Sequence, residues 1–335
     1  MVVQIVTDRS KNGIRPLDPA HDLPQLASLI ESAFGEELSD GGRQVLRELR
    51  FLGWLGPLNY LFTSTLGQEN DIFTGFVWVQ DGNVVGNITV NRPSGYSRRW
   101  QISNVAVVES CRRQGIARKL MEAAIDLILY RGGNTAYLYV RQENEAAFKL
   151  YQSMGFVSVD RMTDLRLVPS RAEREAETRV APSVLRPLTL AEGEQLYQLA
   201  LDASSFGQRW LHQVRRDQFM VSQGDLVFGW LEALFSGQRT LSWGTFDREA
   251  LAVGVMLQSS FLFNRRPHRL RLWVRPDRRG QIEARVVDDV MDLLAKQSRR
   301  QVLISLPAQE QAAIDALVDH GFQERRTLIL MKLDL

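Results

Sequence analysis

A short basic segment, Arg112-Arg113-Gln114-Gly115-Ile116-Ala117-Arg118, follows the apolar run Val105-Ala106-Val107. After Gly115 the apolar residues recur at helical spacing, which predicts that the glycine lies at the start of an amphipathic helix. The first turn of such a helix offers free backbone N–H groups and the positive end of the helix dipole, and small residues let an anion approach the backbone. The segment therefore predicts a phosphate-binding loop between a strand and a helix.

Asn144 and Tyr151 lie seven positions apart in a second helical pattern further along the chain. Seven residues make about two helical turns, so we expect both side chains on one face of one helix. Two polar side chains placed in this way can contact a single ligand. The ordinary alternative for Tyr151 is a core position with a solvated hydroxyl.

Together these two segments resemble the paired signatures of the GNAT acetyltransferase superfamily. The first is Arg112-x-x-Gly115-x-Ala117 after Val-Ala-Val, and the second is Asn144-x-x-Ala147-x-x-x-Tyr151-x-x-x-Gly155-Phe156. Residues 14–168 also follow the family's order of elements. The resemblance implies that the first signature cradles the pyrophosphate of acetyl-CoA, that Asn144 hydrogen-bonds the pantetheine arm, and that Tyr151 protonates the departing coenzyme A thiolate.

The site implied by this resemblance uses acetyl-CoA as the acyl donor and contains no metal ligand. Its catalytic residue is Tyr151. The residues expected to contact acetyl-CoA are Val105, Ala106, Val107, Arg112, Arg113, Gln114, Gly115, Ile116, Ala117, Arg118 and Asn144.

One position departs from the family's pattern. Members that acetylate protein N-termini often carry a glutamate five residues before the motif asparagine, where this chain has Tyr139. A tyrosine, with an unperturbed pKa of about 10, is a poor base at neutral pH, so deprotonation of an amine falls to water or to an unassigned residue. Glu109 is near in sequence, but its place on the loop favours a solvated carboxylate. Cys111 lacks an assignable histidine partner, and we expect structural or surface roles for His21, His212, His268 and His320.

The chain contains two copies of one pattern. Arg186-Pro187-Leu188-Thr189 repeats Arg15-Pro16-Leu17-Asp18, and Gly280 and Gly321 lie 165 and 166 residues after Gly115 and Gly155. Each copy is expected to start with a strand and a capped helix, and in the second copy Thr189 and Glu192 have the spacing of a capping box. Each copy is also expected to contain a hairpin, at Asp81-Gly82 and around 247–249. A further helix is expected over 42–54. The polar stretch between the copies predicts a catalytic domain over 1–168, a linker over 169–182 and a second domain over 183–335.

The second copy differs at the positions where the first carries chemistry. Ile282 stands at the position of Ala117, Leu317 at that of Tyr151 and Glu310 at that of Asn144, and Glu283 places a carboxylate in the loop. A branched side chain and a negative charge both oppose the approach of a phosphate. We therefore expect the second domain to be a degenerate, non-catalytic copy.

Length and composition agree with two globular domains. The chain has 335 residues, of which 44% are hydrophobic and 24% are charged. The fold class expected is α+β, with two tandem GNAT folds that each contain a mostly antiparallel, mixed sheet flanked by helices. A formal net charge of +2 argues against a protein that coats nucleic acid, and no apolar run reaches the length of a bilayer. We expect a cytoplasmic monomer with an intramolecular pseudo-dimer and no membrane or nucleic-acid partner.

The function expected is transfer of an acetyl group to a primary amine of a small molecule by direct attack on acetyl-CoA. Aromatic residues either line the acceptor pocket or belong to the core: Trp54, Tyr60, Trp78, Trp100 and Tyr139. Two alternatives stay open. One is an acyl-CoA-binding sensor that has lost catalysis, and the other is a protein or peptide N-terminal acetyltransferase, which the missing glutamate disfavours.

Overall fold

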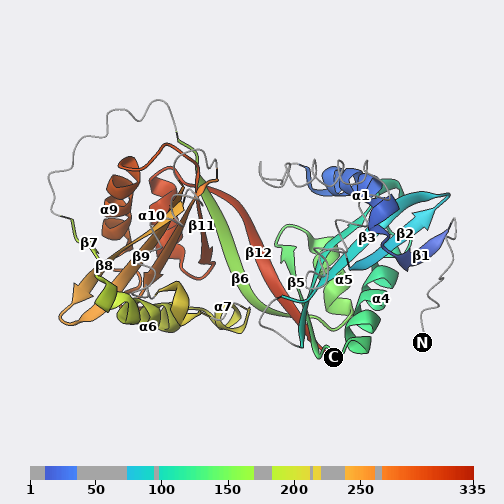
Figure 1. Ribbon diagram of the computed structural model, residues 1–335, viewed down its shortest axis with the longest axis horizontal. Helices are drawn as coiled ribbons and strands as arrows, with labels where there is room; N and C mark the ends of the chain where they lie inside the picture. The colour runs from blue at the N-terminus through green and yellow to red at the C-terminus, as the bar shows by residue number, and fades with distance from the viewer. Residues whose placement is uncertain are drawn as a thin grey trace. The chain divides into compact units, whose positions relative to one another are not determined.

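The computed structural model of the protein describes residues 12–35, 74–93, 98–169, 183–211, 214–219, 238–260 and 266–335. The expected helix over 42–54, most of the expected linker, Trp54, Tyr60 and His212 lie outside these ranges. The chain divides into two compact units (Figure 1). The first comprises residues 1–139, 145–157 and 331–335, and the second comprises 140–144 and 158–330.

The first unit is built on a mixed sheet in the order β1-β2-β3-β4-β5. These strands are β1 (Gly13–Pro16), β2 (Gly75–Gln80), β3 (Asn83–Asn91), β4 (Arg99–Val107) and β5 (Thr135–Arg141), which belongs to this unit through Tyr139. The first four pair antiparallel, and β4 pairs parallel with β5. Asp81 and Gly82 have φ of +50° and +79°, as a two-residue hairpin turn with two left-handed residues requires, so the expected hairpin is confirmed.

The helices of the first unit are α1 (Pro19–Phe34), α4 (Ile116–Tyr130) and α5 (Glu145–Ser153). Helix α1 packs Leu23 and Leu26 in a buried cluster with Val77 of β2. Helix α4 lies on the other face, where a Cβ on Gly86 would come within 3.0 Å of the Ile116 side chain. The two helices cover opposite faces because successive strand residues point to opposite sides.

The second unit contains β7 (Arg186–Pro187), β8 (Gln238–Asp247), β9 (Ala250–Ser260), β10 (His268–Val274), β11 (Val302–Pro307), β6 (Val157–Leu167) and β12 (Gln323–Asp334). In the sheet these strands neighbour one another in the order β7-β8-β9-β10-β11-β6-β12. Its helices are α6 (Gly193–Ala203), α7 (Phe206–Leu211), α9 (Glu283–Ala295) and α10 (Gln311–Asp319). The mixed α and β architecture expected from the sequence is confirmed in both units.

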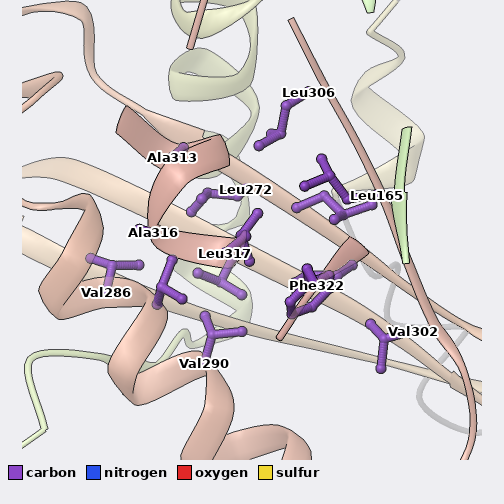
Figure 2. Close-up of a cluster of buried hydrophobic side chains, with 14 of the residues drawn as sticks. Leu165, Leu272, Val286, Val290, Val302, Leu306, Ala313, Ala316, Leu317 and Phe322 are labelled. Carbon is purple, nitrogen blue, oxygen red and sulfur yellow. The ribbon is translucent and has the colours of Figure 1, made fainter. Parts of the chain in front are cut away.

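The core of the second unit lies between α9, α10 and the sheet. Figure 2 shows Val286 and Val290 of α9 and Leu317 of α10 around Phe322. Strand β6 contributes Leu165, which is 1% exposed. Burial of these side chains supplies most of the favourable free energy for packing the helices on the sheet.

The last strand of the first copy belongs to the second compact unit. Strand β6 ends the first copy in sequence, yet it pairs antiparallel with β11 of the second copy, from Met162 opposite Pro307 to Leu167 opposite Val302. The final residues of β12 belong to the first unit, where the Leu335 N–H donates to the Asn134 carbonyl at 2.9 Å. The first copy therefore contributes its last strand to the second unit, whereas β12 stays in the second unit through Leu330.

The duplication is visible in matching ion pairs at the start of each copy. The Arg15 guanidinium donates to both Asp22 carboxylate oxygens, at 2.6 and 2.7 Å. The Arg186 guanidinium likewise pairs with the Glu192 carboxylate, and Thr189 and Glu192 form the expected capping box. Each pair joins a short strand to the helical segment that follows it.

Candidate functional site

The basic loop connects β4 to α4 through a short 3-10 turn, η4 (Glu109–Cys111). Arg113 and Gly115 have φ of +62° and +79°. The first helical hydrogen bond after the loop is from the Lys119 N–H to the Gly115 carbonyl, at 3.1 Å. Within the described ranges, the six preceding N–H groups, those of residues 113–118, donate to no protein acceptor. Such a run of free donors at a helix N-terminus favours binding of an anion.

Two arginine side chains of the loop hydrogen-bond to neighbouring groups of the protein. The Arg112 Nε donates to the Val107 carbonyl at 3.2 Å, and the Arg118 guanidinium donates to the Ser153 hydroxyl at 2.5 Å. The second contact links the loop to the end of α5. Residues 112–115 are exposed, Ala117 is half-buried, and a Cβ on Gly115 would meet nothing within 4 Å. Its left-handed backbone, rather than crowding by protein atoms, therefore explains the glycine.

Strand β4 leads into the loop along an open edge. Its parallel pairing with β5 covers only three positions, from Arg99 opposite Thr135 to Gln101 opposite Tyr137. Beyond them β4 continues to Val107 and pairs with β3 alone among the described strands. Backbone groups of a strand alternate in direction, so this stretch leaves N–H and C=O groups without a ladder partner on its β5 side. An extended ligand can pair there and reach the loop with its phosphates.

Tyr151 is buried in the first unit. It is 6% exposed, and its ring centroid lies 6.1 Å from that of Phe156. Burial raises the pKa of Tyr151 to about 12, and its hydroxyl has no hydrogen-bond partner among the residues that the structure describes. At neutral pH the hydroxyl keeps its proton and is available as a donor.

Part of the first copy is similar to known proteins. Residues 34–156 match the Acetyltransferase (GNAT) family. Over 99 aligned residues the chain is 36% identical to N-alpha-acetyltransferase 30 of Schizosaccharomyces pombe. The alignment covers 30% of this chain and 60% of that protein. Residues 34–156 are therefore similar to the GNAT acetyltransferases.

Two solved GNAT structures align with nearly the whole chain, and this similarity is one of fold. A GCN5-related N-acetyltransferase from Sphaerobacter thermophilus aligns with a TM-score of 0.60 and 16% identity over 98% of this chain and 96% of that one. A tandem GNAT protein from the clavulanic acid biosynthesis pathway aligns with a TM-score of 0.52 and 15% identity over 96% and 98%. The chain spans between 36% and 60% of the length of the first curated relatives that it matches.

Asn144 of the second GNAT signature immediately precedes α5, which begins at Glu145. The expectation that Asn144 and Tyr151 lie on one helix is therefore wrong by one residue at the helix start. Asn144 is exposed, and its backbone N–H donates to the Arg141 carbonyl at 3.0 Å. This bond fixes the turn between β5 and α5.

The aromatic residues expected either at the acceptor pocket or in the core have different surroundings. Trp100 is 1% exposed, and its indole nitrogen is buried without a hydrogen-bond partner in the described part of the chain, so Trp100 belongs to the core. Trp78 is half-buried, with the Lys119 ammonium 5.2 Å from its ring centroid. Tyr139 is half-buried and packs edge-on to Tyr137. Among the described members of this group of five aromatic residues, Trp78 and Tyr139 have partly exposed side chains.

The other ionisable candidates have structural partners or solvated positions. Glu109 is exposed, and the Cys111 thiol lies 3.6 Å from the Gln80 side-chain oxygen. His21 pairs with Asp18, His268 contacts the Ser298 carbonyl, and His320 lies between the Ala316 carbonyl and Asp288. No cluster of potential metal ligands occurs among the described residues.

In the second copy, the Glu283 side chain of the loop accepts hydrogen bonds from the loop's own N–H groups. Gly280 has φ of +76°, close to that of Gly115. The Glu283 carboxylate, only 4% exposed, accepts the N–H groups of Gly280 at 2.8 Å and Ile282 at 3.1 Å. These are donors that a phosphate would need. The sequence indicated a carboxylate of unfavourable sign here, but not that it folds back onto the loop.

Glu310 lies in the same region as Glu283. The pKa of Glu310 is raised to about 7, mainly by burial; Arg279, 3.0 Å away, acts to lower this pKa and Glu283 acts to raise it. This position corresponds to Asn144 in the first copy. An acidic side chain therefore replaces a neutral amide in the second copy, and its ion pair with Arg279 uses a guanidinium that would otherwise attract an anion.

Proposed function

We propose that the first unit transfers an acetyl group from acetyl-CoA to a primary amine of a small molecule. The observation that carries this proposal is the run of six free N–H groups over 113–118 at the end of an unpaired strand edge. The loop suits the pyrophosphate, and the open edge of β4 suits the amide-containing pantetheine arm. The residues of the first unit that we assign to acetyl-CoA are those expected from the sequence in the range 105–118, whereas Asn144 belongs to the second unit.

The reaction is direct attack of a neutral amine on the thioester carbonyl. The nitrogen lone pair forms the new C–N bond, the C–S bond breaks, and its electron pair leaves on the coenzyme A sulfur. Tyr151 donates its phenolic proton to that sulfur and recovers one from the amine by way of water. Holding two substrates in line supplies several kcal/mol through effective concentration, so the protein contributes mainly positioning.

No carboxylate is assigned as the base. Tyr139 stands at the position where a glutamate often occurs in N-terminal acetyltransferases, so the amine loses its proton to solvent in this account. Turnover should therefore rise with pH until the free amine of the acceptor dominates. This behaviour distinguishes the proposal from a mechanism that uses a buried base.

A second candidate acceptor is a protein or peptide N-terminus. The similarity to N-alpha-acetyltransferase 30 favours it. The chemistry is the same, and only the acceptor differs. A non-catalytic acyl-CoA sensor is the third possibility, which requires acetyl-CoA binding without turnover of any amine.

We further propose that acetyl-CoA binds in the first unit alone. The self-filled loop at Glu283 supports this assignment, because binding of a phosphate there must first displace a buried carboxylate from two N–H donors. The second unit then serves as a non-catalytic partner. None of the helices that the structure describes combines the length and apolar character of a membrane span.

The activity is tested by a thiol-release assay with acetyl-CoA and a panel of amines, polyamines, aminoglycosides and peptides. We expect release of coenzyme A to depend on a primary amine and on Tyr151. Turnover of peptides alone would select the second candidate. Binding of acetyl-CoA with no turnover of any acceptor would select the sensor.

A further inference from the structure

Strand β4 contains a bulge close to the loop. Asn87 of β3 lies opposite Ala106, whereas Thr89 lies opposite Ser103, so the pairing shifts by one residue between them. Two residues of β4, Asn104 and Val105, therefore share Ile88 as their partner. Asn104 has φ of +52°, the left-handed conformation that is usual for glycine at the first position of such a bulge.

Two polar side chains of β3 are buried beside this bulge. Asn87 is 0% exposed and Thr89 is 5% exposed. The Asn87 amide donates to the Asn104 carbonyl at 3.0 Å, and the Asn104 amide donates to the Thr89 hydroxyl at 3.3 Å. Both backbone and side chain of Asn104 are thus held by β3.

This polar pair occupies a face of the sheet that is otherwise apolar. Asn87 lies opposite Val77 on one side and Ala106 on the other, and both of these residues belong to the cluster under α1. Burying an amide in such surroundings is unfavourable unless it is hydrogen-bonded, and the Asn87 side-chain oxygen has no partner among the described residues. The contacts that Asn87 does make are directed at Thr89 and Asn104.

The bulge lies within the part of β4 that β5 does not cover. Pairing with β5 ends at Gln101, and Asn104 is followed by Val105-Ala106-Val107 and then by the loop. An extra residue in a strand reorients the backbone groups that come after it. The conformation of Asn104 therefore determines where the N–H groups of this open segment point.

We propose that Asn87 and Thr89 are positioning residues that hold Asn104 in its left-handed conformation, and so aim backbone N–H groups of the open β4 segment at the thioester carbonyl of bound acetyl-CoA. The inference rests on the proposed function, because it requires acetyl-CoA along β4. Donors fixed in advance stabilise the oxyanion that develops during attack. Their direction matters for the acetyl group and not for the pyrophosphate, which binds at the loop.

The test uses the full chain and [1-13C]acetyl-CoA, and needs no acceptor. The infrared stretch of the labelled carbonyl moves to lower wavenumber when the carbonyl accepts hydrogen bonds. In Asn87→Ala and Thr89→Val we expect the stretch to return toward its value in free acetyl-CoA. The affinity for coenzyme A, measured by calorimetry, should change by less than about 2-fold. Asn83→Ala, an exposed asparagine at the start of β3, is the matched control and should keep the parental stretch.

Two variants of Asn104 separate backbone conformation from loss of a side chain. Asn104→Gly should keep the shifted stretch, because glycine adopts positive φ freely, and Asn104→Val should lose it, because a β-branched residue does not. If Asn87→Ala does not fold, the comparison of Asn104→Gly with Asn104→Val still tests whether the conformation of Asn104 directs the N–H groups. Identical spectra for the two Asn104 variants, or parental spectra in both β3 variants, would overturn the inference. Binding with an unshifted carbonyl in the parent would overturn it too, whereas no binding in the parent would overturn the proposed function as well.

Discussion

Replacing Tyr151 with phenylalanine removes one hydroxyl and keeps a ring to pack against Phe156. Tyr151 is 6% exposed, and burial raises its pKa to about 12, from an ordinary value near 10. Because this pKa lies about 2 above the ordinary value, the native state favours the neutral phenol over the phenolate by about 3 kcal/mol. Removal of the hydroxyl at neutral pH leaves no buried partner behind among the described residues, so little stability is lost.

The pH dependence follows from the direction of this shift. The unfolded chain ionises its tyrosine near pH 10 and the native protein does so near pH 12. The contribution of Tyr151 to stability is therefore complete below pH 10 and is lost between pH 10 and pH 12, by up to about 3 kcal/mol. Tyr151→Phe has no such proton and escapes this loss. At pH 7 its turnover should fall by about 10²-fold, with little change in affinity for acetyl-CoA.

The assay compares urea unfolding of the two proteins at pH 7 and pH 11, together with thiol release at pH 7. At pH 11 the parent should have lost about 1.4 kcal/mol more stability than Tyr151→Phe, because the native and unfolded pKa values bracket that pH. Equal losses in the two proteins would refute the burial argument. Parental turnover in Tyr151→Phe would refute the role as general acid.

Three further variants test individual features. Gly115→Ala should lower stability by about 1 kcal/mol, because φ at this position is +79° although the added Cβ would meet no atom within 4 Å. Gly133→Ala should lower stability more, because its Cβ would lie 2.4 Å from the Ile128 side chain. Thermal unfolding of the two variants compares these losses. Glu283→Ala should lower the free energy of unfolding by about 2 kcal/mol, because two N–H groups of the loop lose a charged acceptor, and exposed Glu324→Ala should not. Equal effects of the two substitutions in urea unfolding would contradict this. Arg113→Ala should weaken acetyl-CoA binding by about 5-fold in calorimetry and reduce its salt dependence, whereas an affinity independent of Arg113 would exclude it from the phosphate site.

Local signals in the sequence predicted most elements of the fold. Asp81-Gly82 indicated a hairpin because both residues tolerate positive φ, and Thr189 and Glu192 indicated a capping box; both are present. The start of α4 after Gly115 followed from helical spacing. These features depend on a few neighbouring residues, which explains why they can be read from the chain itself.

The position of β6 in the second unit could not be predicted in the same way. Alternation along β6 indicates that Leu165 and Leu167 face a core, but this pattern is satisfied equally beside β5 or beside β11. The choice of neighbour depends on contacts far apart in sequence. For the same reason the sequence could place Glu283 in the loop without showing that its carboxylate accepts two of the loop's own N–H groups.

The bulge at Asn104 has only a weak signal in the sequence. An asparagine in a run of strand-forming residues is a frequent left-handed position, and the next residues are those of the open edge. Its partner Asn87 is a polar residue at a buried strand position, which is also unusual. Neither residue alone shows that they meet, because their contact depends on the register of β3 and β4.

The central claim is that acetyl-CoA binds once, at the loop of the first unit. Calorimetric titration of acetyl-CoA into the full chain, Ala117→Glu and Ile282→Glu tests it most directly, because the two substitutions place the same charge at equivalent positions of the two loops. We expect a stoichiometry of one for the parent and for Ile282→Glu, and no binding to Ala117→Glu, where bulk and charge oppose the phosphates. Two sites in the parent, or equal loss of binding in both variants, would contradict the account.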